Sequence, residues 1–111
     1  MTDVHPDIDN NTISEKQRDL LLRWAGRYIW WKTPDEALRY PQRILAQVMN
    51  IGDYADVQEM VEAFGNNTLC AVIRQAEIGQ FNDRSWAYWH YRLGLASPEQ
   101  VPPQPTRKVA D

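Results

Sequence analysis

The chain has 111 residues, which suits one domain with a single hydrophobic core, and its composition of 43% hydrophobic and 24% charged residues is that of a folded protein. Twelve Lys and Arg against fifteen Asp and Glu give a formal net charge of -3, which excludes a global attraction to nucleic-acid phosphates or anionic lipid. The single cysteine, Cys70, excludes an intramolecular disulfide and a multi-cysteine zinc site, and no apolar run approaches the ~20 residues of a membrane span.

Two expectations follow from this composition. Cys70 lies among apolar residues in "TLCAVI" and is predicted to be a buried small hydrophobe. A cytoplasmic location is the default for a chain with these features.

The N-terminal part of the chain is predicted to be a flexible arm over residues 1–13, followed by a helix over about 15–30. Ser14 and Gln17 form a capping box in front of that helix. Apolar residues then recur at helical spacing, at Leu20, Leu21, Trp24, Ala25 and Tyr28.

A second capping box opens a short helix, with Thr33 as N-cap, Pro34 at the first helical position and Glu36 reaching back. Pro41 disfavours helical geometry at the residue before it, so we expect this helix to end there and a new one to open. The new helix carries an apolar face formed by Ile44, Leu45, Val48 and Met49. Gly52 is predicted to end it in the left-handed conformation.

The remaining signals predict three more helices. Asp53 caps one over about 54–64, which Gly65 ends in the same left-handed way, and Asn66 or Asn67 caps the next over about 67–77, which stops near Gly79. Asn82 then opens a last helix that runs through the aromatic stretch to Gly94.

The fold class predicted from this pattern is all-α, a single compact bundle of five or six short helices over residues 14–95. The chain after Leu95 reads "ASPEQVPPQPTRKVAD". Its prolines are expected to forbid a helix and to favour an extended, polyproline-like tail over residues 96–111.

The stretch "RSWAYWHYRLGL" raises the question of what so much aromatic surface contacts. On a helix, Trp86, Trp89, His90 and Leu93 lie on one side, which is expected to face the core. An outer set points the other way and forms a candidate partner-contact face, to which the basic end of the tail adds two residues. The candidate contact residues are Trp31, Tyr88, Tyr91, Arg92, Arg107 and Lys108. Either a partner or the protein's own proline-rich tail could cover this face.

No catalytic, cofactor-binding or metal-binding residue is predicted. His90 has no second histidine at ligand spacing and is interpreted as a hydrogen-bonded structural residue. The carboxylate pairs Asp53 with Asp56 and Glu59 with Glu62 are interpreted as caps and solvated charges. The chain also lacks G-x-S-x-G, a glycine-rich phosphate loop and H-E-x-x-H, so we expect a protein that is not an enzyme and needs no cofactor.

Two non-enzymatic functions remain. The first is a protein-binding role, which uses the exposed aromatic residues and tolerates mild acidity; the acidity favours a basic partner. The alternative is a DNA-binding regulator, because helices at about 54–64 and 67–77 on either side of Gly65 superficially resemble a helix-turn-helix. This alternative requires exposed arginines clustered along the second helix or along the same helix of a dimer mate, and the sequence supplies one positive charge there, Arg74.

Several runs of the sequence resemble an uncharacterised family of small bacterial helical proteins: "WWKTPDEAL", "ILAQVMNIGD", "DVQEMVEAFG", "RSWAYWHYRLGL" and "VPPQPTRK". The resemblance covers roughly residues 24–108. Members of that family are often encoded beside an abortive-infection-type nucleotidyltransferase toxin. The resemblance therefore implies an antitoxin that restrains such a nucleotidyltransferase, and it names no catalytic residue in this chain.

Overall fold

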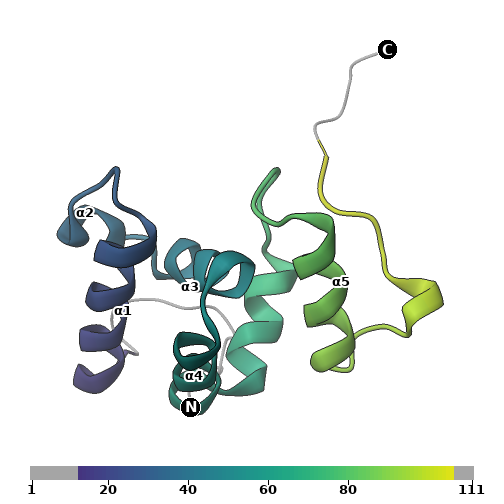
Figure 1. Ribbon diagram of the computed structural model, residues 1–111, viewed down its shortest axis with the longest axis horizontal. Coiled ribbons are helices and arrows are strands. Elements are labelled where there is room, and N and C mark those ends of the chain that lie inside the picture. The colour runs from purple at the N-terminus through teal and green to yellow at the C-terminus, as the bar shows by residue number, and fades with distance from the viewer. Residues whose placement is uncertain (1–12, 107–111) are drawn as a thin grey trace, which may run out of the picture.

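The computed structural model describes residues 13–106, and these residues form helices and connecting segments with no strand among them (Figure 1). The predicted all-α class is therefore confirmed. The chain order is α1 Glu15–Tyr28, α2 Pro34–Leu38, α3 Pro41–Ile51, α4 Tyr54–Arg74, α5 Asp83–Arg92 and a 3₁₀ turn η1 Pro98–Gln100.

Four of these helices begin at the predicted caps. Ser14 with Gln17 and Thr33 with Glu36 form complete capping boxes at α1 and α2. The side chains of Asp53 and Asn82 accept backbone N–H groups at the starts of α4 and α5. These side chains satisfy donors that have no partner inside the helix, so the helix starts are encoded locally.

Helix α3 lies at the centre of the molecule. It contacts α1, α2, α4 and α5, and Figure 1 shows it between α1 and α2 on one side and α5 on the other. Ile44, Leu45 and Val48 on this helix are fully buried. The core continues into the neighbouring helices through Leu21, Trp24, Met60, Leu69, Val72 and Trp89.

Gly65 interrupts α4 with φ 81° and ψ 163°; φ is positive as predicted, but ψ lies outside the left-handed helical region. This region of backbone space is open essentially to glycine alone, and the helix is kinked at this residue. Figure 1 shows that α4 is not straight. Asn66 and Asn67 lie inside α4 and do not cap a separate helix, which corrects that prediction. The second half of α4 ends at Arg74 instead of continuing through residue 77 towards Gly79. Residues 75–82 form a non-helical connection, within which Gly79 has φ 76°.

The structure corrects the prediction for Gly52. The residue does end α3, but its backbone is extended, with φ -65° and ψ 151°, and is not left-handed. A Cβ at this position would lie 2.5 Å from the carbonyl oxygen of Val48, so close packing is the reason for the glycine. The chain can then pass directly into the cap at Asp53.

Two further predictions need correction. Residues 98–100 form a 3₁₀ turn, because a proline is accepted at the first position of a helical turn, and Gln100 N donates to Ser97 O at 3.0 Å. Val101 directly after this turn is extended, with φ -67° and ψ 125°, and residues 101–106 form no regular secondary structure. Cys70 is half-buried and not fully buried.

Candidate protein-binding surface

Helix α5 separates the aromatic stretch into two faces. Trp86, Trp89 and His90 are buried. Tyr88 and Tyr91 are 48% and 44% exposed on the other side. The helical spacing therefore assigned these side chains correctly, apart from Leu93, which is only partly buried against the core.

The buried face fixes α5 firmly on the rest of the molecule. The indole N–H of Trp89 donates to the carbonyl oxygen of Met49 at 2.8 Å, which ties α5 to α3. His90 Nδ1 lies 2.7 Å from the carbonyl oxygen of Trp86, so the histidine is hydrogen-bonded within its own helix as predicted. The outer residues consequently lie on a helix that is hydrogen-bonded to the central helix of the core.

Arg92 links the exposed side of α5 to α4. Its guanidinium donates to the Tyr88 hydroxyl at 3.0 Å and to Gln58 Oε1 at 3.2 Å. It also lies over the ring of Trp89, 5.2 Å from the ring centroid. These contacts hold the charged group in one orientation at the junction of the two helices.

The exposed aromatic surface continues beyond α5. Tyr54, 79% exposed, lies one helical turn before Gln58 on α4 and so shares its side of the helix. Ile51, 52% exposed, lines a shallow hollow of about 360 Å³ together with Tyr88 and Arg84. We call this surface the tyrosine face and define it by Ile51, Tyr54, Arg84, Tyr88, Tyr91 and Arg92.

Trp31 does not belong to the tyrosine face. It lies between α1 and α2, 56% exposed, with its ring 5.4 Å from that of Trp30. Figure 1 shows this segment on the far side of α3 from α5. Trp31 lines a different hollow of about 530 Å³, with Tyr40, Arg43 and Glu77 on its walls. The predicted contact residues are thus divided between two places, and Arg107 and Lys108 lie outside the described residues.

The proline-rich tail contacts a different side of α5 from the tyrosine face. The indole N–H of Trp86 donates to the carbonyl oxygen of Pro102 at 2.7 Å. Tyr88 and Tyr91 keep their exposure beside this tail. Of the two occupants that the sequence left open, the tail therefore does not cover the tyrosines over the part that the structure describes.

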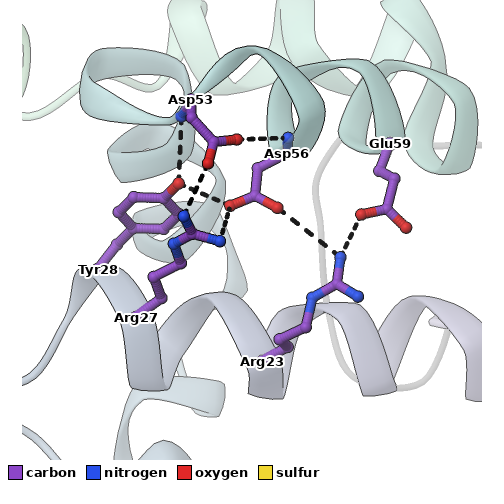
Figure 2. Close-up of polar contacts among 6 residues, drawn as sticks. All are labelled: Arg23, Arg27, Tyr28, Asp53, Asp56 and Glu59. Atoms are coloured by element: carbon purple, nitrogen blue, oxygen red, sulfur yellow. Dashed lines mark hydrogen bonds and ion pairs between the residues drawn. The ribbon is translucent and has the colours of Figure 1, made fainter.

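A buried polar network joins α1 to the start of α4, and the sequence did not predict it (Figure 2). Asp56 is buried and accepts a hydrogen bond from the Tyr28 hydroxyl at 2.6 Å. The same hydroxyl accepts the backbone N–H of Asp53 at 3.1 Å. Arg27 adds an ion pair to each aspartate, at 2.7 Å and 3.3 Å. The interpretation of Asp56 as a solvated charge was wrong, whereas Asp53 is a cap as predicted.

Arg23 completes this network by pairing with Glu59 and, at 3.8 Å, with Asp56. Burial of the ring raises the pKa of Tyr28 above its usual value, and the hydrogen bond to the Asp56 carboxylate raises it further. The sequence shows Tyr28 on the apolar stripe of its helix and Asp56 three residues after the cap Asp53. It does not show that Tyr28 and Asp56 contact each other, because they are 28 residues apart in the chain.

Residues 13–106 contain no group of three His, Cys, Asp or Glu side chains placed to hold a metal ion together. The second half of α4 and the residues just after it offer one arginine, Arg74, which is exposed. The cluster of arginines that the DNA-binding alternative requires is thus missing from that helix. No helix within the described part of the chain is long and apolar enough to cross a membrane.

No protein-family model matches the chain, and no curated protein or solved structure matches it either. The resemblance to the small bacterial helical family stays a prediction.

Proposed function

We propose that this protein is a non-enzymatic binding protein that contacts a protein partner through the tyrosine face. One observation carries the proposal. Four large apolar side chains, Ile51, Tyr54, Tyr88 and Tyr91, are each 44% to 79% exposed around an arginine that is itself held in place. Tyrosine and arginine are enriched among the residues that dominate binding energy at protein interfaces.

The charge of the face indicates the chemistry of the partner surface. Arg84 and Arg92 place two positive charges beside the tyrosines, although the whole chain is acidic. The proposed partner patch is therefore apolar with carboxylates at its rim, which differs from the basic partner that the net charge favours. Within this proposal, the partner itself is the nucleotidyltransferase toxin that the sequence resemblance implies, and the protein is its antitoxin.

The first test is co-expression with a neighbouring nucleotidyltransferase, followed by gentle purification and mass spectrometry. We expect a stoichiometric complex and relief of toxicity. Isolation of the protein alone would contradict a stable complex. Recovery of nucleic acid without a protein would instead favour the alternative that uses the two halves of α4, and its affinity should then fall steeply with salt.

A pair of matched variants tests the face itself. Tyr88→Ala with Tyr91→Ala removes exposed aromatic area from α5, whereas Trp30→Ala with Tyr40→Ala removes a larger exposed aromatic area on the other side of the molecule. We expect the first variant to weaken the complex at least about tenfold, as loss of interface hot spots does, and the second to leave it within about twofold. If instead only the Trp30→Ala with Tyr40→Ala variant weakened the complex, the interface would include Trp30 and Tyr40.

A further inference from the structure

The C-terminal tail lies in a groove beside α5, where Figure 1 shows it running along that helix. Trp86 donates its indole N–H to the carbonyl oxygen of Pro102 at 2.7 Å, and Gln104 donates to Asp83 Oδ1 at 2.6 Å. Val101 packs against the core. We call this surface the tail groove and define its walls by Ile73, Arg74, Trp86, His90 and Leu95.

The chemistry of this contact is that of polyproline recognition. An extended proline segment has no internal hydrogen bonds, so its carbonyl groups are free to accept from a partner. An aromatic groove that supplies a donor can therefore bind such a segment at a low entropic cost. Trp86 supplies both the aromatic surface and the donor, and the ring of His90 lies beside it with the two centroids 4.5 Å apart.

The tail leaves part of its groove unfilled. A hollow of about 390 Å³ remains between the groove walls and Pro102, Pro103 and Pro105. Arg74 lines this hollow, is exposed, and its guanidinium has no ion pair or hydrogen bond within residues 13–106. The groove thus presents an unused cation next to the prolines.

Position along the tail indicates what this cation would recognise. Pro105 lines the same hollow as Arg74, and an extended chain advances about 3 Å per residue, so a carboxylate one or two residues further on comes within reach of the guanidinium. The protein's own sequence has Arg107 and Lys108 after Pro105, which have the same sign of charge as Arg74. A segment with carboxylates at these two sequence positions would therefore complement the charge of Arg74, whereas the protein's own sequence has no carboxylate there.

We propose that the tail groove is a binding site for a proline-rich segment of another protein, one that has acidic residues directly after its prolines. The tail occupies the site as a weaker intramolecular ligand and is displaced on binding. This site is separate from the tyrosine face, since Trp86 and Tyr88 lie on different sides of α5. The inference does not depend on the identity of the partner proposed above.

The test compares two peptides on the full-length ¹⁵N-labelled protein: VPPQPTRK, which copies residues 101–108, and VPPQPTEE, in which two glutamates replace the basic residues. NMR follows the indole N–H of Trp86 and the backbone amides of the tail. We expect VPPQPTEE to shift the Trp86 signal and release the tail, with an affinity about twofold to fivefold above that of VPPQPTRK, the range that a partly exposed ion pair supplies. Added salt should remove the difference.

Two variants keep the test specific. Arg74→Glu should reverse the preference between the two peptides, and Trp31→Phe, far from the groove, should leave that preference unchanged. The proposal fails if neither peptide shifts Trp86 at about 1 mM, the range of weak binding, or if Arg74→Glu leaves the preference unchanged. It also fails if the tail leaves the groove only when the protein dimerises at high concentration, because the groove would then bind the tail of a second copy.

Discussion

Tyr28 and Asp56 show how single residues join distant parts of this chain. Tyr28 is the last residue of α1 and lies on its apolar stripe, whereas Asp56 belongs to the first turn of α4. Their hydrogen bond is buried, and arginines on α1 neutralise the carboxylate from the solvent side. A buried carboxylate requires such partners, because burying an unpaired charge is strongly unfavourable.

Tyr28→Phe should therefore destabilise the protein. The variant keeps the ring but removes a hydroxyl that donates to Asp56 and accepts from Asp53, which leaves buried polar groups with fewer partners. We expect a loss of about 1 to 3 kcal/mol in the free energy of unfolding, measured by urea denaturation. Tyr54→Phe is the matched control, since this tyrosine is 79% exposed, and should change stability by less than about 0.5 kcal/mol.

The same hydroxyl predicts a pH dependence. The pKa of Tyr28 is raised in the folded protein, so the folded state holds this proton more tightly than the unfolded chain does. The contribution to stability is complete below the ordinary tyrosine pKa of about 10 and decreases as the pH rises through the folded value. Urea unfolding across the alkaline range should show a steeper loss for the wild type than for Tyr28→Phe. Equal slopes would mean that Tyr28 titrates normally.

At the scale of the elements, two glycines of helical segments have opposite roles. Gly65 interrupts α4 with a positive φ of 81°, whereas Gly26 lies inside α1, where a Cβ added to it would meet no atom within 4 Å. The first is required by backbone conformation. The second weakens a helix without a visible steric reason.

Substitution by alanine should separate these roles. Gly26→Ala should stabilise the protein by about 0.5 to 1 kcal/mol, because alanine is the better helix former. Gly65→Ala should destabilise it by about 1 to 3 kcal/mol, because a side chain is strained at that φ and ψ. Thermal and urea unfolding of the two variants check both signs. If Gly65→Ala were neutral, α4 would have to straighten at low cost, which its far-UV helix content would reveal.

At the scale of the whole molecule, α3 organises one continuous core. Every other α-helix contacts it, and its residues Ile44, Leu45 and Val48 are fully buried. A single core without internal boundaries is expected to unfold in one cooperative step.

Ile44→Ala should lower the free energy of unfolding by about 2 to 5 kcal/mol, the usual cost of truncating a fully buried aliphatic side chain. Tryptophan fluorescence and far-UV circular dichroism should still report the same midpoint, because the core is shared by all the helices. Ile51→Ala, on the same helix but 52% exposed, is the control and should cost far less. Separate midpoints would mean that α1 and α2 unfold independently of α5.

The sequence by itself determined where four of the helices begin and which side of α5 is buried, but it wrongly predicted a further helix start at Asn66 or Asn67. Capping boxes at Ser14 and Thr33, and the spacing of Trp86 and Trp89, are local patterns whose physics acts within one or two turns. The end of α4 at Arg74 and the extended backbone of Gly52 were not predicted, because chain packing decides them and several backbone conformations are locally allowed.

Only the tertiary structure decided which distant residues meet. It paired Tyr28 with Asp56, connected Arg92 to Gln58, placed the tail against Trp86 and separated Trp31 from Tyr88. A sequence pattern identifies an exposed aromatic residue, but it does not show how helices pack around α3. That packing depends on the fit of side chains from all the helices at once, and it therefore determines which exposed residues form one surface.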